Sequence, residues 1–119
     1  MIKVLLADDH PLVLSGIETV LRETRFEVVT TVDNGNAVLE AIPRVEPEIL
    51  IMDLRMPGRS GLDVLRTLRQ RGDSRLIVIL TAHVNDRDLV EALQLGVNGL
   101  LLKDSAPGLL LTCLEQLSR

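Results

Sequence analysis

The sequence predicts an α/β fold: a doubly wound parallel sheet of five strands in the order 2-1-3-4-5, with a helix after each strand. Five short apolar runs alternate with five segments of helical spacing along the 119 residues, which is the pattern of repeated strand–helix units. The apolar runs are nearly unbroken, as in strands covered on both faces. Right-handed crossovers then place helices on both sides of the sheet. No linker-like segment divides the chain, so we expect one domain over residues 1–119.

Each predicted strand is a short apolar run bounded by turn residues. The first run contains one polar residue, Lys3, and the second is rich in valine and other β-branched residues. The third is uninterrupted and is therefore expected at the centre of the sheet. The predicted strands cover residues 2–7, 26–31, 49–52, 76–80 and 99–102.

Start and stop signals place the first two helices. Pro11 fits the first turn of a helix, where its missing N–H is harmless, and Asp9 or His10 can cap that helix. The second helix is predicted to be short, because we expect Pro43 and Pro47 to bracket the connection that follows it.

Similar signals place the other three helices. Ser60 can cap the third helix, and Gly72 and Gly96 fit the ends of the third and fourth. Asp104 or Ser105 can cap the last one. The predicted helices cover approximately residues 11–21, 37–42, 61–71, 86–95 and 106–118.

Composition argues against several functions. Phe26 is the only aromatic residue, which counts against base stacking on nucleic acid and against a site that sandwiches a flavin ring. The net charge of −4 disfavours DNA binding by this domain itself. The single cysteine, Cys113, excludes an internal disulfide, and no apolar run approaches the ~20 residues of a membrane span. We therefore expect a cytoplasmic domain without membrane contact.

Polar side chains follow four of the five predicted strands. In a doubly wound sheet the carboxyl ends of the strands lie at one edge, where ligands bind. Each residue alone fits an ordinary strand end, but together they bring three carboxylates, a hydroxyl and an ammonium group to that edge. They are Asp8 and Asp9 after the first strand, Asp53 at the third, Thr81 at the fourth and Lys103 at the fifth.

The charges at this edge predict a divalent cation. Neighbouring carboxylates repel one another, and a cation relieves the repulsion. Oxygen donors with few protein ligands suit Mg²⁺ better than Ca²⁺, and Mg²⁺ neutralises phosphoryl oxygens. Lys103 and Thr81 can hold further phosphoryl oxygens. One carboxylate then remains as a nucleophile that forms an acyl phosphate.

Four motifs share this edge: DD at 8–9, D-x-x-M-P-x-x-x-G at 53–61, T-A at 81–82 and Lys103. Together they resemble the receiver domain of bacterial two-component response regulators, and the resemblance covers essentially the whole chain. The segments ADDHPLVLSG and LLLKDS are similar to the NarL/FixJ (LuxR-type) subfamily. The resemblance implies a CheY-like, flavodoxin-like fold and a phosphoprotein that regulates transcription.

The resemblance also implies a role for each residue at the edge. Asp53 would accept a phosphoryl group from a histidine kinase, and Thr81 and Lys103 would contact the bound group. The Mg²⁺ ligands would be Asp9, Asp53 and the backbone carbonyl of Arg55, with Asp8 assisting through water. The domain would not be an enzyme beyond promoting its own phosphorylation and dephosphorylation.

One position departs from the family pattern. The family usually carries Tyr or Phe three residues before the lysine, and rotation of that ring accompanies activation, whereas this chain has Leu100. Phosphorylation does not need the ring, so the open question is how the signal leaves the site. Most regulators of this subfamily carry a DNA-binding domain after a linker, so we expect an effector domain beyond residue 119 and DNA contact only through it.

Other functions stay open at this point. A Mg²⁺-dependent phosphohydrolase would also form an aspartyl phosphate, but its acid–base Asp, two residues after the nucleophile, is replaced by Arg55. A stand-alone receiver or interaction module is a further alternative. A flavin carrier would need a phosphate-binding loop after the first strand, which the sequence lacks.

Four leucines lie partly off the apolar stripes of the first and last helices: Leu12, Leu14, Leu109 and Leu111. If exposed, they would form a surface for kinase docking or for a homodimer. Burial by neighbouring elements is the alternative.

Overall fold

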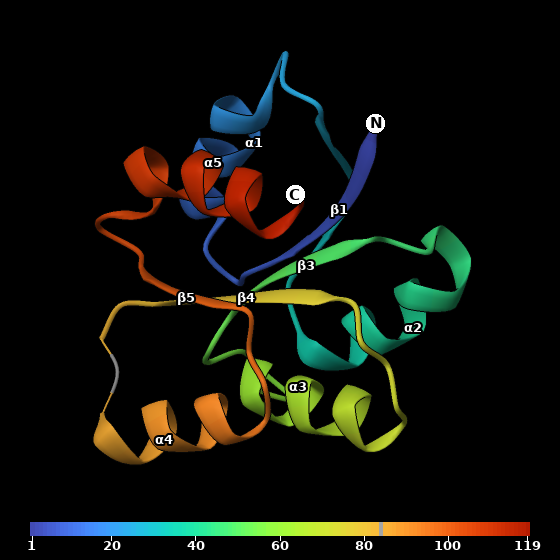
Figure 1. Cartoon of the computed structure of the whole chain (residues 1–119), viewed down its shortest axis with the longest axis vertical. Helices are drawn as coiled ribbons and strands as arrows, with labels where there is room; N and C mark the ends of the chain where they lie inside the picture. The colour runs from blue at the N-terminus through green and yellow to red at the C-terminus, as the bar shows by residue number, and fades with distance from the viewer. Residues whose placement is uncertain (84) are drawn as a thin grey trace.

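A computed structural model describes residues 1–83 and 85–119, with the backbone alone at residue 107. Five parallel strands form one sheet in the order β2-β1-β3-β4-β5, which confirms the predicted topology (Figure 1). The uninterrupted third strand lies at the centre, as predicted. The strands are β1 (Ile2–Ala7), β2 (Phe26–Val32), β3 (Ile49–Asp53), β4 (Leu76–Thr81) and β5 (Gly99–Leu102).

Helices cover both faces of the sheet. In Figure 1 the first and last helices lie together on one face, and the other three lie on the opposite face. The helices are α1 (Pro11–Leu21), α2 (Gly35–Val45), α3 (Gly61–Gln70), α4 (Asp86–Gln94) and α5 (Ala106–Leu117). Within the described part of the chain, no helix has the length and apolarity that a bilayer crossing needs.

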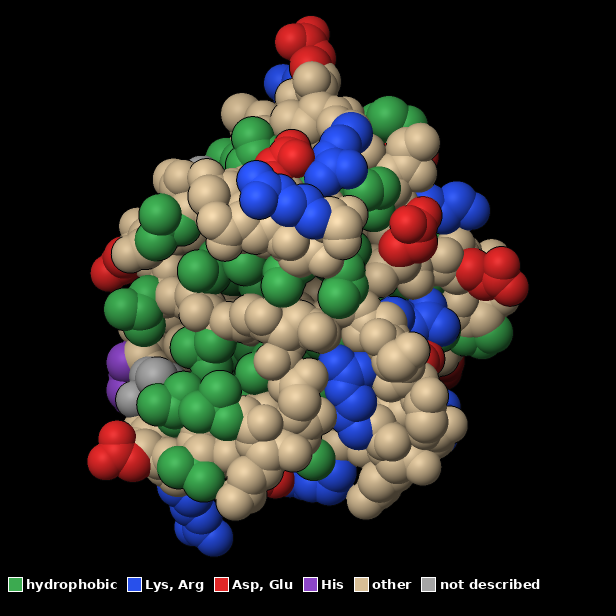
Figure 2. Space-filling model, viewed as in Figure 1, with side chains coloured by type: hydrophobic (Ala, Val, Ile, Leu, Met, Phe, Trp, Pro, Cys, Tyr) green, Lys and Arg blue, Asp and Glu red, His purple; other side chains and the backbone are tan. Residues whose placement is uncertain are grey.

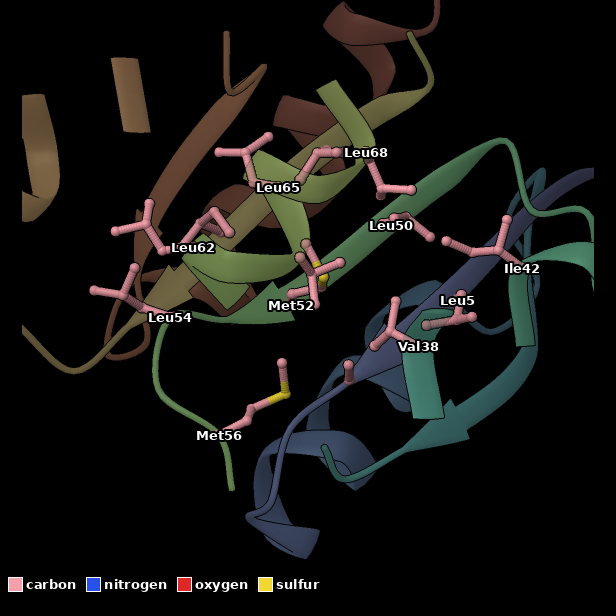
Figure 3. Close-up of a cluster of buried hydrophobic side chains, with 14 of the residues drawn as sticks. Leu5, Val38, Ile42, Leu50, Met52, Leu54, Met56, Leu62, Leu65 and Leu68 are labelled. Carbon is pink, nitrogen blue, oxygen red and sulfur yellow. The ribbon is translucent and has the colours of Figure 1, made fainter. Parts of the chain in front are cut away.

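The sheet divides the hydrophobic core into two clusters. Successive side chains of a strand point to opposite faces, so β3 sends Leu50 and Met52 towards α2 and α3 (Figure 3). It sends Ile49 and Ile51 towards α1 and α5. All four side chains are fully buried. Packing on both faces accounts for the unbroken apolar run, and it fixes the position of Asp53 at the end of the strand.

Three of the predicted helix features were wrong: the place of Pro43 and the side-chain caps of the first and last helices. Pro43 lies inside α2, which continues to Val45, and does not begin the connection. It is exposed and lies in the last turn, so its missing N–H removes one helical bond without ending the helix. His10 and Ser105 occupy the N-cap positions of α1 and α5, but neither side chain forms a capping hydrogen bond.

The signals around α3 were correct. The Ser60 hydroxyl accepts a hydrogen bond from the Asp63 N–H at 3.1 Å, and the Asp63 carboxylate accepts one from the Ser60 N–H, which forms a reciprocal capping box. Gly72 follows the helix with φ of +76°, a left-handed conformation that glycine adopts without strain. These contacts fix the start of α3, directly after the loop that follows Asp53.

Half of the predicted apolar surface is exposed. Leu12 is 88% and Leu109 52% exposed, whereas Leu14 and Leu111 pack against the cluster beneath α1 and α5. Further exposed apolar side chains lie on α4 and β5. Figure 2 shows the face of the molecule that is seen in Figure 1, where apolar side chains lie among charged ones.

Candidate functional site

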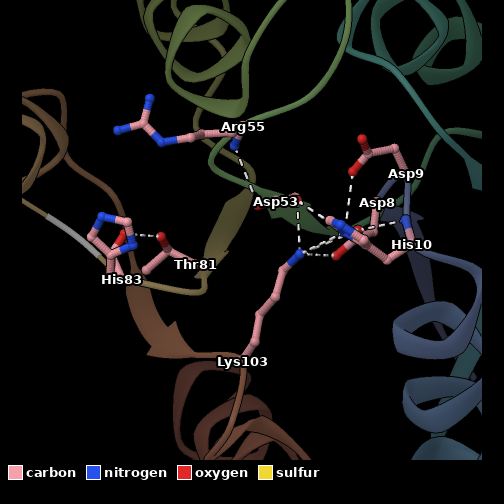
Figure 4. A network of polar contacts seen from close by, with 8 residues as sticks. All are labelled: Asp8, Asp9, His10, Asp53, Arg55, Thr81, His83 and Lys103. Carbon is pink, nitrogen blue, oxygen red and sulfur yellow. Dashed lines mark hydrogen bonds and ion pairs between the residues drawn. The ribbon is translucent and has the colours of Figure 1, made fainter.

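The predicted polar residues meet at the carboxyl edge of the sheet (Figure 4). The strand register brings them together: Ala7 pairs with Met52, Asp53 with Leu80 and Thr81 with Leu102, so the strands end nearly level. An open cavity of about 250 Å³ lies at this edge. Its lining comprises Asp9, His10, Asp53, Arg55, Thr81, Ala82, His83 and Lys103.

Lys103 connects the acidic residues of two strands. Its Nζ lies 2.8 Å from Asp53 Oδ2 and 3.0 Å from Asp8 Oδ2, and it donates a hydrogen bond to Asp8 Oδ1 at 3.3 Å. The side chain of Asp8 is fully buried, and those of Asp53 and Lys103 are 6% and 13% exposed. At this depth one ammonium group faces two carboxylates, so negative charge remains in excess.

Burial dominates the ionisation of Asp53. Desolvation raises the pKa of its carboxyl group above the usual value, and the charge of Asp8 adds to the rise. The hydrogen bonds from Lys103 and from the Arg55 N–H lower the pKa but offset only part of that effect. For Lys103, burial lowers the pKa, but its hydrogen bonds to Asp53 and Asp8 outweigh burial and leave the pKa raised.

His10 is a site residue that the sequence reasoning missed. The sequence predicts His10 only as a residue at the start of the first helix. In the structure its Nδ1 lies 2.8 Å from Asp8 Oδ1, 3.2 Å from Asp9 Oδ1 and 3.1 Å from Lys103 Nζ. Its backbone N–H also donates to Asp8 Oδ1 at 2.9 Å. The signal for it was its place directly after the acidic pair, where the chain turns from β1 into α1.

The acidic side of the site fits a divalent cation. One ligand atom each from Asp8, Asp9, His10 and Asp53 lies within 4.8 Å of the others. Asp8 Oδ2 is buried and accepts no hydrogen bond from any described residue, since Lys103 Nζ, 3.0 Å away, contacts it without hydrogen-bond geometry. A buried carboxylate oxygen that accepts no hydrogen bond, beside two further carboxylates, is a donor set that a hard cation satisfies.

The loop after Asp53 is held tightly against the strand end. The Arg55 N–H donates to Asp53 Oδ1 at 3.2 Å, and the Gly61 N–H donates to the Leu54 carbonyl at 3.0 Å. A Cβ atom at Gly61 would lie 2.3 Å from the backbone oxygen of Asp53. Only glycine therefore lets α3 begin this close to the backbone at the end of β3.

Alanine at Gly61 is expected to destabilise the domain and disturb the site together. Because the obstructing atom belongs to the backbone of β3, the strand end or the start of α3 must move, with a loss of about 2 kcal/mol in the free energy of unfolding. Thermal or urea unfolding measures this loss. Gly16, where a Cβ would meet nothing within 4 Å, is the control: Gly16→Ala is expected to be neutral or slightly stabilising. Equal effects at both positions would contradict the crowding argument.

Thr81 lines the cavity but its hydroxyl is turned away from Asp53. It donates to the backbone carbonyl of His83 at 2.6 Å (Figure 4). Leu100, on β5, is partly buried and packs against the cluster beneath α2 and α3. The structure thus brings the acidic residues and Lys103 into contact and leaves Thr81 beside them without a bond to the carboxylate.

The comparisons with known proteins agree with this architecture. The response regulator receiver domain family matches residues 4–115. The chain is 40% identical over 119 residues to a nitrate/nitrite response regulator protein homolog of Haemophilus influenzae, covering 99% of this chain and 56% of the relative. It is 36% identical over 114 residues to the nitrate/nitrite response regulator protein NarL of Escherichia coli, covering 95% of this chain and 53% of the relative.

A solved structure extends the agreement to three dimensions. The isolated REC domain of RcsB from Salmonella enterica, in the presence of the phosphomimetic BeF3−, superposes with a TM-score of 0.90 at 32% identity. The match covers 98% of this chain and 88% of that chain.

A doubly wound sheet with acidic residues and a lysine at its carboxyl edge is the architecture of a two-component signalling domain. The chain belongs to the response regulator receiver domain family. Its relatives place it among the receivers of NarL/LuxR-type regulators. The chain spans about half the length of the curated relatives that it matches, 56% and 53%.

Proposed function

We propose that Asp53 accepts a phosphoryl group from a histidine kinase in a Mg²⁺-dependent reaction, and that the resulting change of conformation controls a transcriptional output. The observation that carries this proposal is the contact of the Asp53 carboxylate with Lys103 at 2.8 Å, beside the buried Asp8 oxygen that accepts no hydrogen bond. That arrangement offers a nucleophile, a fixed cation and a donor set for Mg²⁺ at one edge of the sheet.

Each side chain has a part in the transfer. A carboxylate oxygen of Asp53 forms the new bond to phosphorus while the bond from phosphorus to the donor atom breaks, and the leaving group keeps that electron pair. Lys103 balances negative charge on the phosphoryl oxygens from its place beside Asp53. Thr81 would exchange its bond to the His83 carbonyl for one to a phosphoryl oxygen, which needs a rotation of its side chain.

Asp9, Asp53 and the backbone carbonyl of Arg55 would hold Mg²⁺, and Asp8 would assist through water. When bound, the ion neutralises phosphoryl oxygens and the excess carboxylate charge. His10 Nδ1 lies against the same carboxylates, so His10 has to share this space with the ion.

Mass spectrometry of the intact protein tests the proposal. Incubation with acetyl phosphate and Mg²⁺ is expected to add a single group of about 80 Da, and hydroxylamine, which cleaves acyl phosphates, should remove it. A chelator should suppress the adduct. An adduct of the same yield without any divalent ion, or one that resists hydroxylamine, would count against an acyl phosphate formed at this site.

The alternative is a Mg²⁺-dependent phosphohydrolase. The Arg55 side chain at the position of the acid–base Asp disfavours it, because guanidinium groups stay protonated and cannot exchange a proton with a leaving group. Turnover of an added phosphomonoester, at many products per protein molecule, would favour this alternative.

The partners of the whole protein are proposals as well. A histidine kinase would supply the phosphoryl group, DNA would be contacted through a separate effector domain, and the exposed Leu12 and Leu109 are available to a homodimer or a kinase. The domain boundary at residue 119 and the cytoplasmic location stay predictions.

A further inference from the structure

Arg55 connects the phosphoacceptor loop to the first turn of α4. Its Nη2 donates to Asp88 Oδ2 at 2.9 Å. The Arg55 side chain is 64% exposed, whereas that of Asp88 is 20% exposed. The pair thus joins a solvent-facing guanidinium to a residue of the capped first turn of α4, where the backbone N–H of Asp88 donates to the Asn85 side chain at 2.8 Å.

The same arginine lies at the rim of the phosphoacceptor cavity. It lines the cavity together with Asp53, and its backbone N–H holds the Asp53 carboxylate. In Figure 4 the guanidinium is directed away from Asp53, towards the side from which α4 begins. The long side chain starts two residues from the nucleophile. Rotation about its side-chain bonds can therefore move the guanidinium from the side of Asp88 to the side of Asp53.

The charges around the cavity decide whether the Arg55 guanidinium lies beside Asp88 or beside a modified Asp53. Lys103 and Arg55 are the permanent cations among the residues that line the cavity, and Lys103 is already engaged by Asp53 and Asp8. A phosphoryl group replaces the single charge of the carboxylate by ≈ −1.5 to −2 and adds strong acceptor oxygens. Guanidinium binds such oxygens through two parallel hydrogen bonds, so the phosphorylated site competes with Asp88 for Arg55.

We propose that Arg55 is a phosphoryl-binding side chain that Asp88 holds away from the site until Asp53 is modified. This inference rests on the proposed phosphorylation of Asp53. On modification the guanidinium leaves Asp88, and the first turn of α4 loses its tether to the phosphoacceptor loop. The middle of α4 stays attached to α3, because Arg66 on α3 pairs with Glu91 on α4. The release is therefore local, and it carries the signal to α4 without an aromatic ring at Leu100.

Binding of the phosphomimetic BeF3− in the presence of Mg²⁺, followed by NMR, tests the exchange. Asp88→Asn is expected to lower the half-saturating BeF3− concentration about threefold, the scale of an exposed ion pair. Asp86→Asn is the matched control: Asp86 is also acidic and in the first turn of α4, so the same charge is removed from the same helix end. It should leave the concentration unchanged, and Asp88→Glu, which keeps the charge, should stay close to wild type.

The variant Arg55→Ala separates the exchange from a general charge effect. It should raise the half-saturating concentration about tenfold, and Asp88→Asn should then have no further effect in that background. Hydrogen exchange gives a second measurement. In wild type, BeF3− should speed exchange in the first turn of α4, whereas in Asp88→Asn exchange should be fast from the start.

Two results would overturn the inference: equal behaviour of Asp88→Asn and Asp86→Asn, or an Asp88→Asn effect that persists in Arg55→Ala. Either can occur while the wild-type domain still binds BeF3− and accepts a phosphoryl group, so the proposed function survives them. If the wild-type domain responds to neither BeF3− nor acetyl phosphate, the proposed function and the inference fall together.

Discussion

Asparagine at position 53 is expected to abolish the acyl phosphate and, at the same time, to stabilise the unmodified domain. The amide lacks the nucleophilic carboxylate, so labelling by acetyl phosphate should fall at least ~10³-fold, the scale seen when a nucleophile is removed. Intact-mass measurement under the conditions that label wild type gives the answer. An undiminished adduct would move the phosphoacceptor to another residue.

The gain in stability follows from the pKa of Asp53. Burial raises that pKa, so the fold favours the neutral carboxyl group over the ionised one. The contribution of a group with a raised pKa is complete below its unfolded pKa of 3.8 and is lost as the pH rises through the folded pKa. Ionised Asp53 therefore destabilises the folded state at neutral pH, and the uncharged amide of asparagine avoids this cost.

The expected gain from Asp53→Asn is on the order of 1 kcal/mol in the free energy of unfolding at neutral pH. The difference between the variant and wild type should shrink as the pH falls towards the acid range, where wild-type Asp53 is protonated. Urea unfolding of both proteins, measured without divalent ions at several pH values, checks the sign. A variant that is less stable at neutral pH would show that the bond to Lys103 outweighs burial.

Methionine at Lys103 is the second large effect. The substitution keeps the aliphatic stem but removes the charge between Asp8 and Asp53. The side chain of Asp8 is fully buried, and that of Asp53 is 6% exposed. Leaving buried carboxylates without their cation costs about 3 kcal/mol. The pKa of Lys103 is raised, so its stabilising contribution is complete at neutral pH and is lost only as the pH rises above the usual lysine range.

The chain supplies a matched control, because its other lysine, Lys3, is exposed on β1. Lys3→Met should change the free energy of unfolding by less than about 0.5 kcal/mol. Added Mg²⁺ should recover part of the loss in Lys103→Met, because the freed carboxylates then bind the ion in the folded state only. If the two lysine variants unfold alike, Lys103 does not compensate the acidic cluster.

The sheet was predictable because its rules are local. Unbroken apolar runs such as the one over residues 49–52 mark strands covered on both faces, and their carboxyl ends share one edge. Pro43 was not predictable in the same way, because a proline in the last turn of a helix depends on whether the surrounding helix is stabilised by packing. The buried Val38, Ala41 and Ile42 supply that packing in α2.

The site was predictable as a set of residues but not in its side-chain directions. Strand ends alone bring Asp8, Asp53 and Lys103 together, and the structure confirms their contact. The His10 ring contacts Asp8 and Asp9 beside it and also Lys103 from the end of β5, and this last contact cannot be read from the local sequence. The turn of the Thr81 hydroxyl towards a carbonyl depends on the loop after β4. Likewise, no sequence spacing indicates that Arg55 meets Asp88.

The division of the core by the sheet has a consequence for how the domain tolerates change. Leu50 and Ile51 are adjacent in the sequence, yet they belong to clusters that share no buried member among the described residues. Substitutions in different layers that lie well apart and share no partner are therefore expected to add in their effects on stability. Residues on α1 and α5, where Leu12 and Leu109 are exposed, can therefore change to fit a new partner while the cluster beneath α2 and α3 keeps its packing.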